Sequence, residues 1–167
     1  MALTIEDGSL VENADSFVSR ADYITYADSK GITIADEEAA DIELRQAVDF
    51  LCSHEGRIKG FKVDRDQALC FPRYNFNAEG FEWSSDEIPR QVVLCQMALA
   101  LEIHAGVDLY NPKINQVAKR ERVDGAVEVE YFGQDNGVKL SKDSRALALL
   151  SSLLRNNGLF SIKMERS

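Results

Sequence analysis

The segment RQVVLCQMALALEIHAG, at residues 90–106, constrains the fold more than any other part of the chain. Between Val92 and Leu101 its only polar residue is Gln96. A helix that is apolar on nearly every side has to be buried on most sides. The segment therefore predicts a helix at the centre of the domain, with other elements packed around it.

Capping and stop residues predict the bounds of four helices. Serine or aspartate precedes each apolar run, and glycine or asparagine stands at several of the ends. The predicted helices run from Ser19 to Gly31, from Asp36 to Ser53, from Ser85 or Asp86 (with Pro89 in the first turn) to Gly106, and from Ser141 or Asp143 to Asn157. The second of these has a core-facing stripe at helical spacing, formed by Ala40, Leu44, Ala47, Val48 and Leu51.

The rest of the chain predicts little regular structure apart from one hairpin. Residues 56–89 are rich in aromatic residues and lack periodicity, which indicates loops with short extended pieces. Asp124-Gly125 lies between two alternating runs and predicts a β-hairpin over residues 119–131. The expected fold is mainly α, a bundle of about four helices with one β-hairpin and a long aromatic loop. A chain of 167 residues fits one domain; we expect it over residues 1–155, followed by a tail or strand over 156–167 that a partner can order.

Charge is distributed unevenly along the chain. The net charge is -9, and residues 1–56 alone carry 13 acidic and 3 basic residues, whereas residues 57–90 carry 6 of each. Tight phosphate binding requires several lysines or arginines on one surface, so the first third of the chain opposes it. No apolar run is long enough to span a bilayer, and the start lacks the features of a secretory signal. We therefore expect a protein that folds in the cytoplasm and does not bind membranes.

The stretch VAKRERVDGAVEVEYF, at residues 117–132, contains the densest basic cluster. Its three bases are matched by four acids between residues 119 and 131, so the predicted hairpin is a poor phosphate-binding site. Alternation along the strands places four residues on one side of it, Arg120, Arg122, Val127 and Val129. A two-stranded hairpin is marginal in water. It therefore needs a surface to lie on, from its own helices or from a neighbouring subunit.

A second basic stretch, at residues 56–76, is the best candidate for contacts with a nucleic acid. Four aromatic residues are interleaved there with five bases, Arg57, Lys59, Lys62, Arg65 and Arg73. Proteins that bind single strands combine a basic groove with aromatic rings on which bases stack. The alternative is that the rings pack beneath a long loop while the cationic stems cover apolar surface. We favour this alternative, because the acidic residues 1–56 lie immediately upstream.

Catalytic and metal-binding patterns are lacking. The only histidines are His54 and His104, and a nucleophilic pair of Cys70 with His104 has no flanking signature. The spacing of the three cysteines, Cys52, Cys70 and Cys95, predicts buried free thiols. Four acids of the second predicted helix are interpreted as a solvated face, because no metal-ligand spacing accompanies them: Glu37, Glu38, Asp41 and Glu43. We expect neither an enzyme nor a cofactor.

Five segments occur in an order that resembles a known family. They are ADSFVSRADYITYADSKG, LRQAVDFL, GFKVDRDQALCFPR, IPRQVVLCQMALALE and KRERVDGAVEVEY, within residues 1–155. This order resembles the head–tail connector, or adaptor, proteins of the tailed-phage neck, a family also labelled as DnaT-like single-stranded-DNA-binding proteins. The resemblance implies a mostly helical virion protein without catalytic residues.

The connector resemblance also implies partners and a location. About twelve copies would form a ring below the portal protein, meet a tail-side neck or stopper protein, and extend the channel through which genomic double-stranded DNA passes unbound. The protein would be assembled in the host cytoplasm and reside in the virion neck. Channel-facing candidates are Glu37, Glu38, Asp41 and Glu43. Candidates for contacts with neighbours and portal are Arg120, Arg122, Val127, Val129, Tyr131, Leu159, Phe160 and Ile162.

The other label implies a different function. A DnaT-like accessory protein of replication would bind single-stranded DNA. Its contacts in this chain would be Arg57, Lys59, Lys62, Arg65 and Arg73.

Overall fold

The structure, a computed structural model, describes residues 2–78, 80–110 and 145–155. Its helices are α1 (Arg20–Asp28), α2 (Glu37–Ser53), α3 (Arg90–His104) and α4 (Arg145–Leu153), with a short 3-10 turn, η1 (Glu55–Arg57). Its strands are β1 (Phe61–Lys62), β2 (Arg73–Tyr74), β3 (Phe76–Ala78) and β4 (Phe81–Trp83).

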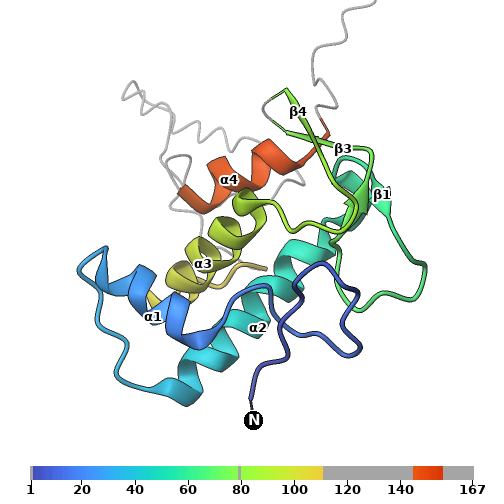
Figure 1. Cartoon of the computed structure of the whole chain (residues 1–167). Helices are drawn as coiled ribbons and strands as arrows, with labels where there is room; N and C mark the ends of the chain where they lie inside the picture. Colours follow the sequence, from blue (N-terminus) through green and yellow to red (C-terminus); the bar gives the residue numbers. More distant parts are fainter. Residues whose placement is uncertain (1, 79, 111–144, 156–167) are drawn as a thin grey trace, which may run out of the picture.

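Helix α3 lies at the centre of the described part of the chain. It packs between α2 and α4, and α1 packs against α2 and α3 (Figure 1). The short strands gather at one side of these helices, whereas α1 lies at the other side (Figure 1). The predicted position of residues 90–106 at the centre of the domain is therefore confirmed.

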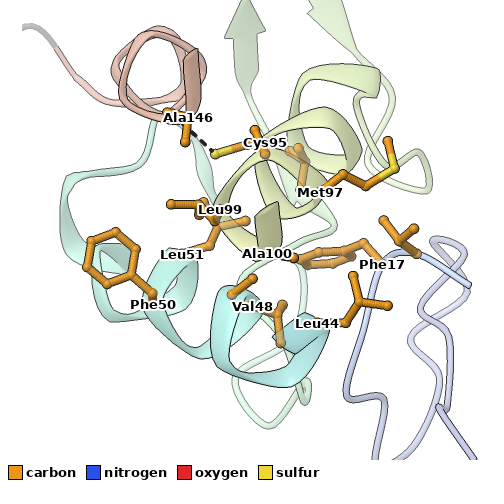
Figure 2. Packing of buried hydrophobic residues seen from close by; sticks show 14 of the residues in the cluster. Phe17, Leu44, Val48, Phe50, Leu51, Cys95, Met97, Leu99, Ala100 and Ala146 are labelled. Atoms are coloured by element: carbon orange, nitrogen blue, oxygen red, sulfur yellow. Dashed lines mark hydrogen bonds between the residues drawn. The ribbon is translucent and has the colours of Figure 1, made fainter. Parts of the chain in front are cut away.

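The core is formed by apolar side chains of α2, α3 and α4 together with the N-terminal segment. Figure 2 shows Leu51 of α2 beside Leu99 of α3, and Leu44 of α2 beside Phe17 of the N-terminal segment. The predicted stripe of α2 is buried at every position, with exposed fractions of 1% or less for Ala40, Leu44, Ala47, Val48 and Leu51. The periodicity of this helix thus correctly predicted its buried side.

Gln96, the one polar residue in the apolar run of α3, is fully buried, and both polar atoms of its side-chain amide form hydrogen bonds. Its Oε1 accepts a hydrogen bond from the Phe17 backbone N–H at 2.9 Å. Its Nε2 donates to Ser16 Oγ at 2.8 Å and to the Leu44 carbonyl at 2.9 Å. One amide group therefore attaches both the N-terminal segment and α2 to the central helix.

The predicted caps of the first two helices are confirmed. The Ser19 side chain accepts from the Asp22 N–H, and the Asp36 side chain accepts from the Glu38 and Ala39 N–H groups. The predicted cap of α3 was wrong: Pro89 stands at its N-terminal boundary and no side chain caps it.

Helix α4 also differs from its prediction. It ends at Leu153, before the predicted Asn157, and its predicted start lies outside the described residues. The reason lies in its neighbour: the Lys59 N–H donates to the Leu153 carbonyl at 3.0 Å, and Ile58 and Leu154 form an antiparallel bridge. The chain leaves the helix to pair with the segment after η1.

The fold is mixed α/β, and the expectation of a helical bundle with one long loop has to be corrected. The aromatic stretch contains two small antiparallel sheets, β1–β2 and β3–β4. In the first, Phe61 lies opposite Tyr74; in the second, Phe76 lies opposite Trp83. Strands of two or three residues are too short to produce a visible alternation in the sequence.

Several predictions fall on residues that the structure does not describe. The hairpin over 119–131 and the tail over 156–167 lie outside the described residues, and so do the eight candidates for contacts with neighbours: Arg120, Arg122, Val127, Val129, Tyr131, Leu159, Phe160 and Ile162. Within the described parts of the chain, no helix is long and apolar enough to cross a membrane.

Candidate nucleic-acid interface

The β1–β2 sheet presents two aromatic side chains to solvent. Phe61 is 51% exposed and Tyr74 is 45% exposed, and they lie directly opposite each other in the strand register. Their ring centroids are 5.5 Å apart, with 30° between the ring planes. We call this pair the aromatic platform. Large apolar rings left in water side by side are a common feature of binding surfaces.

Arg155, at the end of the α4 segment, adds a cation to the aromatic platform. Its guanidinium carbon lies 5.1 Å from the centroid of the Phe61 ring, within the range of a cation–π contact. The side chain also donates to the Gly60 carbonyl at 3.0 Å, and the backbone N–H donates to the Arg57 carbonyl at 2.7 Å. Sequence reasoning missed this residue, because nothing local connects position 155 with position 61.

Arg73 of β2 is buried and bonds to the backbone that leads into β1. It is 5% exposed, and its guanidinium donates to the carbonyls of Lys59 at 2.8 Å, Gly60 at 3.0 Å and Cys70 at 3.1 Å. Burial lowers the pKa of this guanidinium from its ordinary value. Arg73, which the sequence offered as a contact with a nucleic acid, is therefore buried, and its donors are used by backbone carbonyls.

Gly60 allows the segment after η1 to approach β2 closely. Its φ is +68°, and a Cβ at this position would lie 2.6 Å from the Tyr74 carbonyl oxygen. No side chain fits there without moving the backbone of β2. Glycine at position 60 thus permits this close approach next to the two strands that carry the aromatic platform.

The other four basic residues predicted to contact a nucleic acid lie close to Phe61 in the sequence. They differ in whether their charged groups already have a partner in the protein. Arg57 and Arg65 are exposed. Lys62 lies 3.4 Å from Glu55, and Lys59 donates from Nζ to the Ser152 carbonyl at 2.8 Å. Arg57 and Arg65 are the two whose side chains are most open to a phosphate.

The aromatic residues of the stretch divide into two groups. Phe71 and Phe76 are buried against each other, with centroids 5.1 Å apart and an edge-to-face angle of 81°. Phe81 is 72% exposed on β4. An open groove of about 450 Å³ is lined by Tyr74, Asn75, Glu82, Trp83, Ser84 and Ser85. The interpretation that the rings pack under a loop holds for the first group only.

Two of the four acids predicted to form a solvated face on α2 are instead buried. Asp41 is 3% exposed and accepts from both Arg20 Nε and Arg20 Nη2 at 2.8 Å, and this contact lowers its pKa. Arg20 also pairs with Glu37, which remains exposed, as does Glu38. The prediction of a solvated face was thus correct for Glu37 and Glu38 and wrong for Asp41.

Glu43 is the second buried acid, and it connects α1 with the end of α3. It is 9% exposed; it accepts from the Tyr23 hydroxyl at 2.9 Å and lies 2.8 Å from His104 Nδ1. Burial raises the pKa of Tyr23, and the bond to Glu43 adds to this effect. His104, the last residue of α3, therefore pairs with a carboxylate of α2.

The described residues give no support to the other chemistry considered for this sequence. Cys70 lies against Cys52, whereas His104 lies against Glu43, so the two members of the supposed nucleophilic pair have different partners. Among the residues that the structure describes, no group of three or more potential ligands could hold a metal ion.

The comparison with known proteins connects the chain to one family. A family model described as "Putative DnaT-like ssDNA binding protein" matches residues 1–167. Neither a curated protein nor a solved structure was found to match. The prediction of a phage head–tail connector was wrong. The description of the matched family names binding of single-stranded DNA, and none of the comparisons supports a connector. The chain belongs to this DnaT-like family.

Proposed function

We propose that the chain binds single-stranded DNA as an accessory protein of replication, and that bases stack on the aromatic platform. The observation that carries this proposal is the exposed pair of Phe61 and Tyr74 with the Arg155 guanidinium beside it. Both rings lie on a surface that buried Arg73 holds in place. The proposal draws further support from the description of the family.

The geometry of the aromatic platform suits unpaired bases. Every base has a flat π-face, so stacking on aromatic rings tolerates any sequence, and it contributes about 1–3 kcal/mol per base. In a duplex these faces are covered by neighbouring bases. A surface that offers two rings therefore favours single strands over double strands. Tyr74 belongs both to the platform and to the lining of the open groove that reaches β4 residues Glu82 and Trp83.

The electrostatics of the described residues agree with this proposal better than the charge totals suggest. Eight of the thirteen acids between residues 1 and 56 are exposed, but three others are engaged in contacts within the protein. Glu6 accepts backbone N–H groups of its own loop, Asp15 pairs with Arg45, and Asp41 pairs with Arg20. Arg57, Arg65 and Arg155 are exposed, as are Asp64 and Asp66 on either side of Arg65. The proposal assigns the contacts with phosphates to these three arginines, of which Arg155 touches the platform directly.

A nuclear magnetic resonance titration tests where a strand binds. We expect that adding an oligothymidylate to the isotopically labelled full chain shifts the amide resonances of residues 57–62, 73–76 and 155. Amides of α1 serve as an internal control and should stay in place, because α1 lies on the other side of the helices (Figure 1). Shifts confined to α1, or no shifts at all, would contradict the proposal.

A further inference from the structure

Two of the three cysteines, Cys52 and Cys70, lie side by side. Cys52 stands in the last turn of α2, and Cys70 precedes β2 by three residues. Their sulfur atoms are 2.7 Å apart, and the Cys70 backbone N–H donates to Cys52 Sγ at 3.2 Å. A disulfide requires a sulfur–sulfur distance of about 2.05 Å, so a small shift is enough to close the bond.

We propose that Cys52 and Cys70 form an intramolecular disulfide when the protein meets a peroxide. The inference does not depend on DNA binding. It follows from the contact of the two sulfur atoms and from their unequal access to solvent, since Cys52 is half-buried and Cys70 is fully buried. Cys52 is therefore the more accessible of the two thiols.

The surroundings of the two thiols assign a role to each. The hydrogen bond with the Cys70 thiol lowers the pKa of Cys52, and the Cys70 backbone N–H contributes in the same direction. Burial raises the pKa of Cys70 well above its ordinary value. Because the thiolate is the nucleophile, Cys52 is the group that attacks the peroxide.

The reaction proceeds in two balanced steps. The Cys52 thiolate attacks one peroxide oxygen; an S–O bond forms, the O–O bond breaks, and the departing hydroxide takes up a proton to leave as water. The Cys70 sulfur then attacks the sulfur of the Cys52 sulfenic acid; the S–S bond forms, the S–O bond breaks, and the Cys70 proton leaves with the hydroxide as a second water. Two thiols lose two electrons, and one hydrogen peroxide becomes two waters.

Cys95 provides a matched control inside the same chain. It is fully buried, its sulfur lies 3.9 Å from the Ala146 carbonyl oxygen (Figure 2), and burial raises its pKa to about 12. It has no sulfur partner in the described residues and no low-pKa thiolate. We expect it to stay reduced while the other two react.

The test treats the reduced full chain with hydrogen peroxide and follows thiol titre, intact mass and the peptide map. We expect the loss of two thiols per chain, a mass decrease of two hydrogen atoms, and a cross-linked peptide that contains Cys52 and Cys70. A dithiol reductant should reverse all three changes. Cys95→Ser should behave like the wild type, and Cys70→Ser should trap a sulfenic acid at Cys52 that a 1,3-diketone reagent captures.

Other outcomes would overturn the inference. They are oxidation of Cys95 at the same rate as Cys52, disulfides between two chains, or a sulfinic acid at Cys52 while Cys70 stays free. The peptide map of the wild-type protein decides among these outcomes, so the test does not depend on whether a cysteine variant folds.

Discussion

The double variant Phe61→Ala/Tyr74→Ala is expected to bind single-stranded DNA at least about 30-fold more weakly than the wild type. Stacking contributes about 1–3 kcal/mol per base, and the variant loses two rings. A loss of about 2 kcal/mol already corresponds to this factor, since 1.4 kcal/mol is tenfold in affinity. Fluorescence anisotropy with a labelled oligothymidylate measures the change directly.

Two further variants separate stacking from folding. Tyr26→Ala is the control, because it removes an aromatic ring of α1, away from the platform. Like Phe61, Tyr26 has a cation beside its ring, since Lys30 Nζ lies 5.5 Å from the ring centroid. The substitution should leave the affinity unchanged. Phe61→Leu/Tyr74→Leu keeps apolar contact between the strands and removes the flat rings, so it should lose affinity like the alanine variant. Full affinity in the leucine variant would show that the platform does not stack bases.

The substitution Gln96→Leu is expected to lower the free energy of unfolding by about 2–5 kcal/mol. Leucine fills a similar volume but leaves the Phe17 N–H buried without a partner, and it removes the hydrogen bonds to Ser16 Oγ and to the Leu44 carbonyl. The unpaired N–H costs about 1–3 kcal/mol, and each lost hydrogen bond costs about 0.5–1.5 kcal/mol. Since a domain has about 5–15 kcal/mol of stability in total, the loss is large. Chemical denaturation monitored by circular dichroism gives the value.

Gln91→Leu is the matched control for this experiment, in the same helix and with the same change. Among the described residues, Gln91 Oε1 is buried and has no hydrogen-bond partner. Its replacement removes an unsatisfied group, so the stability should change by less than about 1 kcal/mol or increase. If both substitutions had the same effect, the hydrogen bonds of Gln96 would not explain its position in the core.

Helices could be predicted from this sequence because their signals are local. Ser19 and Asp36 cap the helices that they precede, and the stripe from Ala40 to Leu51 fixes which side of α2 is buried. The position of Gln96 in an apolar run also marked α3 as central. What the sequence did not reveal was the reason for that glutamine, because its partners lie 79, 80 and 52 residues away.

The site could be predicted only in part. The sequence singled out residues 56–76 as a basic aromatic stretch, but a sequence does not show which arginine is buried. Arg73 and Arg65 look alike in it, and only the carbonyls around Arg73 distinguish them. Arg155 contacts Phe61 across a long separation. Counts of charge also gave a wrong picture of the surface of α2. Asp41 and Glu43 are buried, where Asp41 bonds to Arg20 and Glu43 bonds to the Tyr23 hydroxyl.

The most direct measurement of the central claim is the affinity of the wild-type chain for single-stranded and double-stranded oligonucleotides of equal length as a function of salt. With Arg57, Arg65 and Arg155 on phosphates, the logarithm of the association constant should fall against the logarithm of salt concentration with a slope of about −2, which is roughly 20-fold between about 50 and 200 mM. The single strand should bind more tightly at every concentration. Absence of binding at about 50 mM salt, or equal binding of the duplex, would contradict the account.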